Sequence, residues 1–492
     1  MCIAVRHPGE FMIDSHSQRA CLALLAASTL ALSACSDAGR TADTDTGSAS
    51  DAAMAAGDGL AQGGETGGET APAAADPVIP APAAAASATF LALSDVHRLR
   101  DGHPCTGRTC QTSPAFWTAT QTQAQALLSS QTPDFVIYLG DMPEHSIPDE
   151  SERRPVLANV LDGLENIVSG TTTPLFYLPG NNDTVERNHG RGDFDYCPFT
   201  DHDRSVFNTV DDPTVWPVIN GSADIIDRSR LTDGYYAARI TVGASAAPLR
   251  ILALNTNIYT ADYSRCSDLV DAAATGSAQL DWLADQLDAA TTANEPVLLA
   301  MHVPPGIDGH SGHSMWDDSL AYQGRDTALT GRRMQDVLLT YIGNHQPVIT
   351  TVLAGHTHLN GIRRLHTCEA TPGVSELLVS VPGISTDHGN TPGMKIFELG
   401  GGLEPVEVTT YGATYVEPPV DDYAWSGGIS YGFRTNYPNT TPAGTSLLDQ
   451  VDSLSDDARW VNMWGHLYVD DRDAAVPLDS DYEDAMDVHC TP

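Results

Sequence analysis

The sequence predicts an α/β protein whose helices cover the outside of a layered sheet. Short apolar runs, which are typical of buried parallel strands, alternate along the chain with segments of helical periodicity. Each of five apolar runs also stops abruptly at polar side chains of the kinds that bind metal ions. The five predicted strands cover residues 90–93, 135–139, 175–178, 297–301 and 348–354.

Helices are predicted between and after these strands. Apolar residues recur at helical spacing over residues 116–130 and again over residues 156–167. Ser277 is the predicted N-cap of a third helix, whose apolar stripe covers residues 280–287. A fourth helix is expected around residues 329–342. Three more strands are predicted over residues 249–254, 376–381 and 394–399.

Potential metal ligands follow the five strands directly. In open α/β sheets the functional crevice lies outside the carboxyl ends of the strands, so these side chains are expected to meet. Carboxylate, imidazole and amide groups together favour zinc, with manganese or iron as alternatives, over magnesium. A lone carboxylate such as Asp141 can bridge two divalent cations that act together on a phosphoryl group. The candidate ligands are Asp95, His97, Asp141, Asn181, His302, His356 and His358.

The acidic composition limits the partners of the chain. At 492 residues it is long enough for one large α/β domain with additions, or for two domains, and its formal net charge is −39. Such a surface repels the phosphates of nucleic acids and anionic lipids, so neither is an expected partner. A small anionic substrate can still bind where metal cations reverse the local field.

The N-terminal region has the features of an export signal. The apolar segment 20–32 is too short to span a bilayer, and it leads into Leu32-Ser33-Ala34-Cys35, which resembles a bacterial lipobox. Residues 1–35 are therefore predicted to be a lipoprotein-type signal peptide. The mature protein would be exported to the bacterial cell envelope, periplasmic or at the cell surface, and attached to the membrane only by a lipid on Cys35. A cleaved signal without a lipid is the alternative.

The segment after the signal differs in composition from the rest of the chain. Residues 36–86 are rich in Ala, Gly, Asp, Thr and Pro and contain almost no large apolar side chains. Such a segment cannot bury enough surface to offset its chain entropy. Residues 36–86 are therefore predicted to be a flexible linker.

Six cysteines follow the leader, and an even number in an exported chain predicts disulfide bonds. Cys105 and Cys110 are the favoured single pair, because they enclose a short loop, and the other pairings stay open. None of the six has the CxxC spacing of a thiolate metal site, so no metal is assigned to sulfur.

At the candidate ligands the chain resembles the calcineurin-like metallophosphoesterases. The pattern of that family is D-x-H, G-D, G-N-H-[DE], a lone H and then G-H-x-H. The corresponding residues here are Asp95-Val96-His97, Gly140-Asp141, Gly180-Asn181-Asn182-Asp183, His302 and Gly355-His356-Thr357-His358. The resemblance implies a four-layer α/β/β/α sandwich, with a phosphoesterase domain over residues 87–403. Residues 404–492 are predicted to pack on this domain as a C-terminal cap.

The resemblance also implies a role for each ligand. One metal ion would be held by Asp95, His97 and His358, and the other by Asn181, His302 and His356. Asp141 would bridge the two ions and act as a catalytic residue, and a hydroxide shared by the metals would attack the phosphorus in line.

Within this superfamily the chain looks most like the acid sphingomyelinase-like phosphodiesterases. This narrower resemblance covers residues 88–400 and rests on four segments, which are Leu254-Asn255-Thr256-Asn257, Gln279-Leu280-Asp281-Trp282-Leu283, His302-Val303-Pro304-Pro305-Gly306 and Thr391-Pro392-Gly393. It implies a phosphodiesterase whose substrate is a small-molecule or lipid-headgroup phosphoester.

Position 182 departs from the family pattern. Asn182 occupies the place of a histidine that helps the leaving group depart, and an amide cannot deliver a proton near neutral pH. Asn182 is the second candidate catalytic residue, and two hypotheses follow. Either substrates with good leaving groups, such as phosphoanhydrides, are favoured, as in polyphosphatase-like members that can share the GNND turn, or a nearby histidine replaces the missing acid. The candidate histidines are His103, His189 and His202.

Phosphodiester hydrolysis is the favoured function, and two alternatives stay open. A phosphomonoesterase, nucleotidase or polyphosphatase would use the same site, whereas a non-catalytic surface binding protein would use it only structurally.

Several smaller features each have two interpretations. Arg98 either clamps a phosphate or forms an ordinary ion pair, and His310 either contacts substrate or lies in a solvated loop. Residues 386–388 either line the crevice or form a simple turn. The C-terminal tryptophans, Trp425, Trp460 and Trp464, are interpreted as core residues rather than a lipid or carbohydrate platform.

Overall fold

The structure, a computed structural model, divides the chain into two units, Met1–Val78 and Ile79–Pro492. It describes residues 88–454 and 486–491, apart from residues 106, 146, 148, 186–193, 199–204, 210–215, 221–223, 262, 267, 310–311, 419 and 437–440. All described residues belong to the second unit. The predicted signal peptide, lipid anchor and linker lie outside the described residues, as do His189, His202, His310, Trp460 and Trp464.

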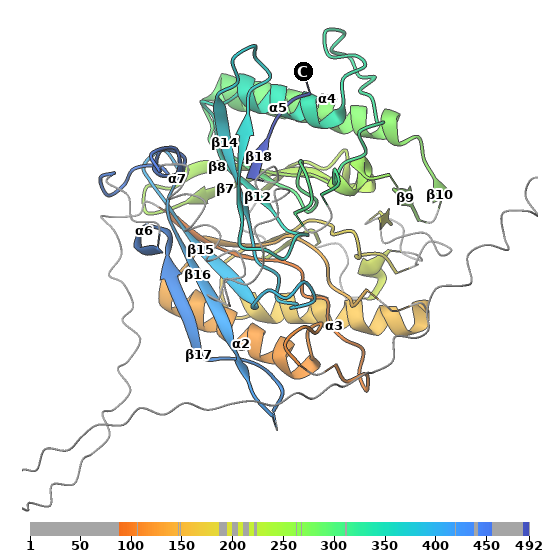
Figure 1. The fold of residues 1–492 in the computed structure, drawn as a ribbon, viewed down its shortest axis with the longest axis vertical. Coiled ribbons are helices and arrows are strands. Elements are labelled where there is room, and N and C mark those ends of the chain that lie inside the picture. The colour runs from red at the N-terminus through yellow and green to blue at the C-terminus, as the bar shows by residue number, and fades with distance from the viewer. Residues whose placement is uncertain are drawn as a thin grey trace, which may run out of the picture. The chain divides into compact units, whose positions relative to one another are not determined.

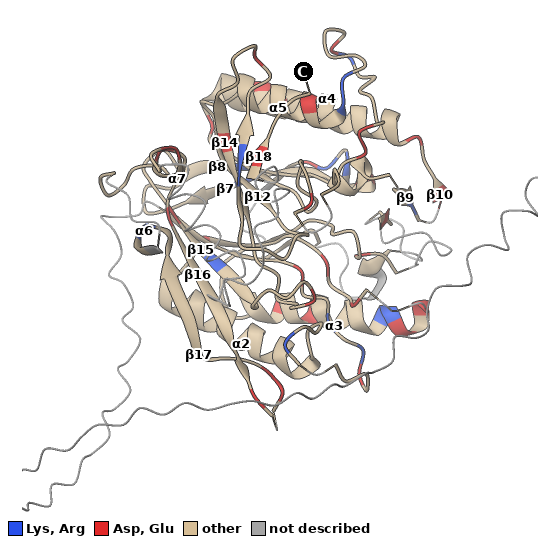
Figure 2. Ribbon diagram, in the orientation of Figure 1, with Lys and Arg blue, Asp and Glu red and all other residues tan. Residues whose placement is uncertain are grey.

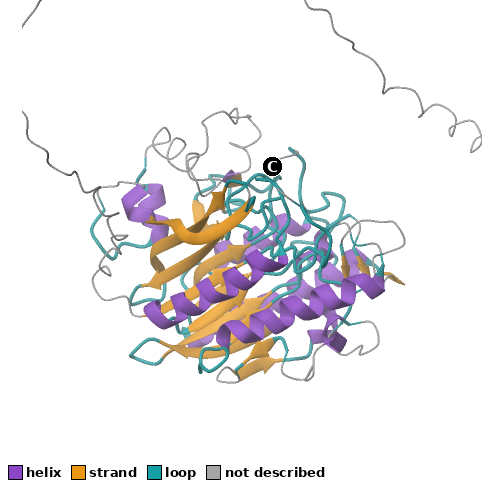
Figure 3. Cartoon of the chain, turned by 90° about the horizontal axis from the view of Figure 1, so that it is seen from below, coloured by secondary structure: helices purple, strands orange, loops and turns teal. Residues whose placement is uncertain are grey.

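Two large sheets pack face to face between two pairs of helices (Figure 1). Helices α2 (Pro114–Gln131) and α3 (Glu150–Val168) cover one sheet, and α4 (Ala272–Ala293) and α5 (Met334–Asn344) cover the other. This arrangement confirms the predicted four-layer α/β/β/α sandwich. In the view from below in Figure 3, helices lie in front of the strands and many loops gather at one end of them.

The first sheet has seven strands, and its parallel centre contains three of the predicted ligand-bearing strands. Its order is β17 (Asp422–Gly432), β16 (Pro405–Val416), β15 (Gly393–Leu399), β1 (Ala88–Leu93), β2 (Phe135–Tyr138), β3 (Leu175–Tyr177) and β5 (Val218–Ile219). Strands β1, β2 and β3 are parallel, whereas β15 and β5 run antiparallel beside them. The ring of Phe90 stacks between those of Phe397 and Phe135, with centroids 4.5 and 4.7 Å away, and anchors β1 in the core.

The second sheet has eight strands and contains the other two ligand-bearing strands. Its order is β18 (Asp487–Val488), β13 (Ile362–His366), β14 (Val374–Ser380), β12 (Ile349–Ala354), β11 (Val297–Ala300), β8 (Ala247–Ala253), β7 (Tyr236–Val242) and β6 (Asp224–Asp227). Strands β8, β11, β12 and β14 are parallel. Each is almost fully buried in its central part, as expected for parallel strands covered on both faces.

A small third sheet and several short helices complete the described part of the chain. A third sheet contains β10 (Asp268–Leu269), β9 (Ser264–Arg265) and β4 (Asp195–Tyr196). The described 3₁₀-helices are η1 (Val206–Thr209), η2 (Leu231–Asp233) and η3 (Thr256–Tyr259), and two short α-helices, α6 (Phe433–Asn436) and α7 (Leu447–Asp452), follow β17.

Two predicted helix boundaries are wrong. Helix α4 begins at Ala272 because Asp271 is its N-cap, with a carboxylate that accepts the Ala274 N–H at 3.0 Å. Ser277 lies inside this helix, where its hydroxyl donates to the Ala273 carbonyl. Helix α5 begins at Met334 rather than near residue 329, because the chain turns at Gly331, whose φ is 86°, before the helix starts.

The chain beyond Leu403 extends the sheets. Strand β16 pairs with β15 and β17 pairs with β16, both antiparallel, so they continue the first sheet. Strand β18 pairs with β13 at the edge of the second sheet. The predicted C-terminal cap is not confirmed by these pairings, while the indole of Trp425 is packed against the hydrophobic core, where its ring stacks on Phe116.

The predicted disulfide between Cys105 and Cys110 is present. The other four cysteines pair as Cys197 with Cys266 and Cys368 with Cys490. Cys490 lies two residues after β18, so its disulfide attaches the described C-terminal segment to the chain that follows β13.

Acidic residues predominate over the described chain, where Asp and Glu are drawn red and the few Lys and Arg blue (Figure 2). Such a protein attracts cations, and bound cations would reverse the local field for an anionic substrate. Within the described residues, no helix combines the length and the apolar character needed to cross a membrane.

Candidate metal centre

The seven predicted ligands lie in loops at the carboxyl ends of five strands, and the structure brings all seven together between the two sheets. The loops follow β1, β2 and β3 of the first sheet and β11 and β12 of the second. Backbone hydrogen bonds connect them within and across the sheets. The Asp95 N–H donates to the Gly140 carbonyl at 2.9 Å, and the Ser385 N–H, from the loop after β14, donates to the Asp95 carbonyl at 2.9 Å.

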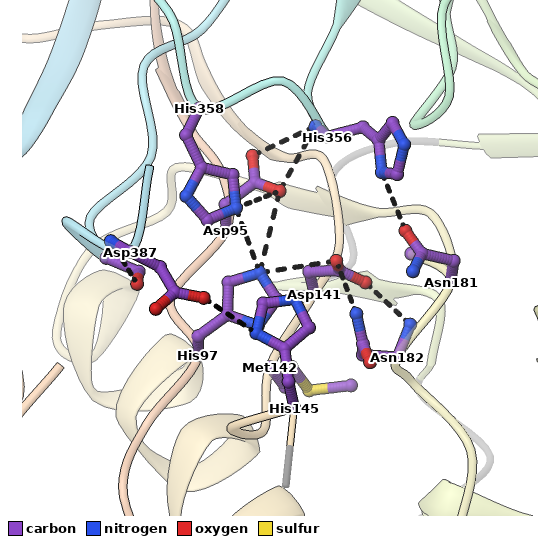
Figure 4. Close-up of polar contacts among 12 residues, drawn as sticks. Asp95, His97, Asp141, Met142, His145, Asn181, Asn182, His356, His358 and Asp387 are labelled. Carbon is purple, nitrogen blue, oxygen red and sulfur yellow. Dashed lines mark hydrogen bonds and ion pairs between the residues drawn. The ribbon is translucent and has the colours of Figure 1, made fainter. Parts of the chain in front are cut away.

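Five of the seven residues have a left-handed backbone conformation. The angle φ is 52° at Asp95, 42° at His97, 65° at Asp141, 67° at His356 and 57° at His358. This conformation costs a residue other than glycine about 1–2 kcal/mol. Strained backbone of this kind clusters at functional sites, where the surrounding structure holds it in place. Here it accompanies side chains that point toward one another (Figure 4).

Two glycines set the distance between the loops that carry Asp141 and Asn181. A Cβ atom on Gly140, where φ is 97°, would lie 2.2 Å from the Gly180 nitrogen. A Cβ atom on Gly180 would lie 2.2 Å from the Asp141 nitrogen. A larger side chain at either position must therefore separate the loops.

Asp95, His97 and His358 form the first cluster of possible ligands, and all three are buried. The Nδ1 atom of His97 lies 3.0 Å from the Pro143 carbonyl and must donate to it, which leaves a lone pair on Nε2 facing the cluster. The Nε2 atom of His358 lies 3.1 Å from that nitrogen and 3.5 Å from Asp95 Oδ1. Burial, together with neighbouring imidazoles, lowers the pKa of His97 and of His358, so both rings are neutral, as metal ligands must be.

His302, His356 and Asn181 form the second cluster. The Nδ1 atom of His302 donates to the Leu139 carbonyl at 2.7 Å, so its Nε2 atom faces Asn181 Oδ1 at 2.9 Å. The same oxygen lies 2.8 Å from His356 Nδ1. Burial acts to lower the pKa of His302, but the Asp141 carboxylate outweighs it and raises this pKa to about 9. A positive charge is thus favoured at this nitrogen, and a divalent cation would replace the proton there.

Asp141 lies between the two clusters. Its Oδ2 atom is 3.3 Å from His97 Nε2 and 3.3 Å from His302 Nε2. Burial alone would raise the pKa of Asp141, but these two histidines hold it well below its usual value, so the carboxylate stays ionised. One anionic oxygen therefore faces one ring nitrogen of each cluster, which fits a carboxylate that bridges two cations.

Asn182 is turned toward Asp141 and is fully buried (Figure 4). Its backbone N–H donates to Asp141 Oδ1 at 2.7 Å and its side-chain Nδ2 donates to Asp141 Oδ2 at 2.9 Å. The amide thus orients the central carboxylate. Its catalytic role stays a prediction.

Asp183 has a supporting role that the sequence reasoning did not assign. Its carboxylate accepts backbone N–H groups from Gly180 at 2.8 Å, Asp141 at 3.0 Å and Met142 at 2.7 Å, and the Tyr177 hydroxyl at 3.0 Å. It therefore joins the Gly140-Asp141 loop to the Gly180-Asn181-Asn182 turn. Its place as the last residue of the G-N-N-D turn was the available signal.

His145 was also missed by the sequence reasoning. Its ring stacks on His97 with centroids 4.1 Å apart, and its Nδ1 atom lies 3.1 Å from Asp387 Oδ2 (Figure 4). The side chain is 30% exposed, so it lies at the solvent side of the first cluster. The hydrogen bond with His145 lowers the pKa of Asp387 to about 2. The available signal was its position in the loop that begins at Asp141.

Residues 386–388 reach the site, because the ring of His388 lies 4.5 Å from that of His358 in an edge-to-face contact. Arg98 instead forms an ion pair with Asp101 at 2.7 Å and donates to the Leu99 carbonyl. This arrangement favours the interpretation of Arg98 as an ordinary ion pair. His103 is exposed on the loop after β1.

The chemistry of these donors fits two divalent cations. Four imidazoles, two carboxylates and one amide oxygen converge, and cations between them would satisfy lone pairs that otherwise face one another. The fold and these donors together are typical of one class of protein. The family model of the calcineurin-like phosphoesterases matches residues 88–360. The chain belongs to the calcineurin-like phosphoesterase family.

The chain is also similar to individual proteins of known name. The chain is 25% identical over 278 residues to acid sphingomyelinase-like phosphodiesterase 3b of Mus musculus, a match that covers 54% of this chain and 53% of that protein. It is 26% identical over 283 residues to sphingomyelinase phosphodiesterase C of Dictyostelium discoideum, covering 54% of this chain and 55% of that protein. The chain thus spans about half the length of these relatives.

Two solved structures also match the chain, with low identity and a low TM-score. A dimetal phosphatase from Danio rerio matches with 13% identity and a TM-score of 0.39, over 70% of this chain and 99% of that chain. PhoD matches with 14% identity and a TM-score of 0.39, over 72% of this chain and 70% of that chain.

Proposed function

We propose that this protein is a two-metal phosphoesterase that hydrolyses phosphodiester bonds in small molecules or lipid headgroups. The proposal rests above all on Asp141, whose Oδ2 atom lies 3.3 Å from a ring nitrogen of each cluster. Two bound cations would supply a nucleophile at neutral pH and neutralise the phosphoryl oxygens. The nitrogen-rich donor set favours zinc, with manganese or iron as alternatives. The names of the relatives support a phosphodiester substrate.

Hydrogen bonds within the protein fix the positions of these ligands. Hydrogen bonds to the carbonyls of Pro143 and Leu139 fix the rings of His97 and His302 with their Nε2 atoms turned inward. Asp183 fixes the loops on which Asp141 and Asn181 lie. The site is therefore preorganised, which reduces the cost of aligning the reacting groups.

The leaving group needs a donor other than Asn182. The amide of Asn182 is buried against Asp141 and carries no titratable proton. His145 contacts the first cluster outside the ligand set and is held by Asp387. We therefore propose that His145 supplies the hydrogen bond to the phosphoryl group or the leaving oxygen.

The non-catalytic alternative is tested by replacing single ligands. The Asp141→Asn and His302→Ala variants are expected to lose bound metal and hydrolysis of bis-nitrophenyl phosphate together. Asp285→Asn, at an exposed carboxylate on α4, is the matched control. Full activity in both ligand variants would exclude the two-metal mechanism. Metal bound without any hydrolysis in the wild-type protein would support a binding protein instead.

The enzymatic alternative is a phosphomonoesterase, nucleotidase or polyphosphatase that uses the same site. Asn182 favours this alternative, because it cannot protonate a leaving group and substrates with good leaving groups need no acid. Turnover of bis-nitrophenyl phosphate, nitrophenyl phosphate and polyphosphate on one preparation separates these activities. A preference for the diester is expected. A strong preference for polyphosphate would replace the phosphodiesterase proposal with the polyphosphatase.

We further propose that the protein is exported and lipid-anchored through Cys35. Three disulfides fit an oxidising compartment. Expression of the full chain in a bacterium, followed by fractionation, tests this. The wild-type protein is expected in the membrane fraction and a Cys35→Ser variant outside it. Equal membrane association of both would contradict the lipid anchor.

A further inference from the structure

A second group of metal-binding side chains lies at the edge of the eight-stranded sheet. It consists of His366, Asp487 and His489, each of which offers one ligand atom within 4.8 Å of the others. His366 ends β13, and Asp487 begins the two-residue strand β18. The group therefore joins positions separated by more than 120 residues in the sequence, and it is not part of the dinuclear site.

Strand pairing explains why these side chains meet. Strands β13 and β18 are parallel, with Arg364 opposite Asp487 and Leu365 opposite Val488. Because side chains alternate between the two faces of a strand, Leu365 and Val488 point together into the core, where both are buried. Arg364 and His366 share the opposite face with Asp487. His489, two positions after Asp487, brings its ring to 4.0 Å from that of His366.

The donors in this group have the composition of a zinc site. His366 Nε2 lies 2.8 Å from Asp487 Oδ1. The guanidinium of Arg364 donates to both oxygens of Asp487, at 2.6 Å and 2.5 Å, and so orients the carboxylate. Two imidazoles and one carboxylate are a common zinc-binding set, and three protein ligands leave one position for water.

Cations from solvent can reach the group. The Asp487 carboxylate accepts hydrogen bonds from the Arg364 guanidinium and from His366, so its oxygens face the group as acceptors. His366 is 8% exposed and His489 is exposed, so an ion can enter from solvent. The net charge of −39 also raises the local concentration of cations.

We propose that His366, Asp487 and His489 bind one zinc-type divalent cation that fastens the C-terminal strand β18 to the edge of the sheet. The Cys368–Cys490 disulfide and the Gln335 side chain, which donates to the His489 carbonyl at 3.2 Å, hold the same segment. In the absence of metal, the hydrogen bond between His366 and Asp487 requires a proton on His366 Nε2. A neutral His366 ring would bind the cation through Nε2 only with its hydrogen on Nδ1 instead.

Metal counting on the full chain tests the proposal. The wild-type protein, the His489→Ala variant and a His103→Ala control, all stripped with a chelator and reloaded with zinc alone, are compared by elemental analysis. His489→Ala is expected to hold one zinc per chain fewer than the other two, whatever the occupancy of the dinuclear site. Equal zinc content in all three proteins overturns the proposal.

A second measurement does not depend on a variant. Crystals of the wild-type protein grown with zinc are expected to show an anomalous peak at the zinc edge within bonding distance of His366, Asp487 and His489. A zinc-loaded crystal without that peak overturns the proposal. A peak here without peaks around Asp141 supports this site while contradicting the proposed dinuclear centre.

Discussion

Because Gly140 lies directly against the Gly180 backbone, the addition of one methyl group at Gly140 is expected to lower both activity and stability. In Gly140→Ala the new Cβ atom would lie 2.2 Å from the Gly180 nitrogen, whereas ordinary contacts begin at 3.4 Å. The loops that carry Asp141 and Asn181 must therefore move apart by about 1 Å, and a misplacement of that size costs about 100-fold in rate. We expect kcat/KM to fall by at least that factor.

The stability cost of the same substitution has two parts. The left-handed backbone, with φ at 97°, costs alanine about 1–2 kcal/mol. Overpacking against a backbone that cannot yield adds about 1–3 kcal/mol. Urea denaturation is therefore expected to show a loss of about 2–5 kcal/mol in the free energy of unfolding.

Gly331→Ala is the matched control. Gly331 has a similar φ of 86°, but a Cβ atom there would meet nothing within 4 Å. This variant should lose only the backbone term of about 1–2 kcal/mol and keep its zinc content and activity. If Gly140→Ala matched Gly331→Ala in stability, zinc content and kcat/KM, the argument from the contact between the two loops would be refuted.

Three further predictions follow from single side chains. Asn182→His should raise turnover of an alkyl phosphodiester, because a general acid contributes a factor of about 100 or more. A rise on anhydride substrates alone would contradict the argument that Asn182 leaves the site without an acid for the leaving group. His145→Gln should lower kcat on diesters while the zinc content stays at the wild-type value, and Asp387→Asn should lower kcat less. A loss of zinc in both variants would show that His145 has a purely structural role. Burial lowers the pKa of Lys395 to about 7 in the folded protein. Between pH 7 and the ordinary pKa of lysine, the side chain is therefore protonated in the unfolded chain but neutral in the folded one. Because the unfolded chain binds more protons in this range, the free energy of unfolding rises with pH. Urea denaturation should show this rise, up to about 1.4 kcal/mol per pH unit, in the wild-type protein but not in Lys395→Met, and parallel profiles of the two would disprove it.

The candidate ligands and their order were readable from the sequence because each depends on local pattern. An apolar run that ends in Asp95 or His302 marks a buried strand and its carboxyl end, wherever that strand lies in the sheet. The α/β class followed from the same alternation. The Cys105–Cys110 disulfide followed from the short loop that these residues enclose.

Helix boundaries show where local pattern is insufficient. Ser277 has the chemistry of an N-cap, but Asp271 and the alanines after it start the same helix six residues earlier. Both residues are good caps in isolation. Only the backbone path decides which one lies at the end of the helix.

Contacts between side chains far apart in the chain were visible only in the folded protein. Local sequence patterns specified the residue types, the strand ends and the order of the possible ligands. They did not determine that Asp141 faces a histidine from each sheet, that Asp387 holds His145, or that β18 brings Asp487 beside His366. These contacts depend on which strands pair and how the two sheets pack, and such long-range choices are made by the burial of the whole core rather than by any local pattern.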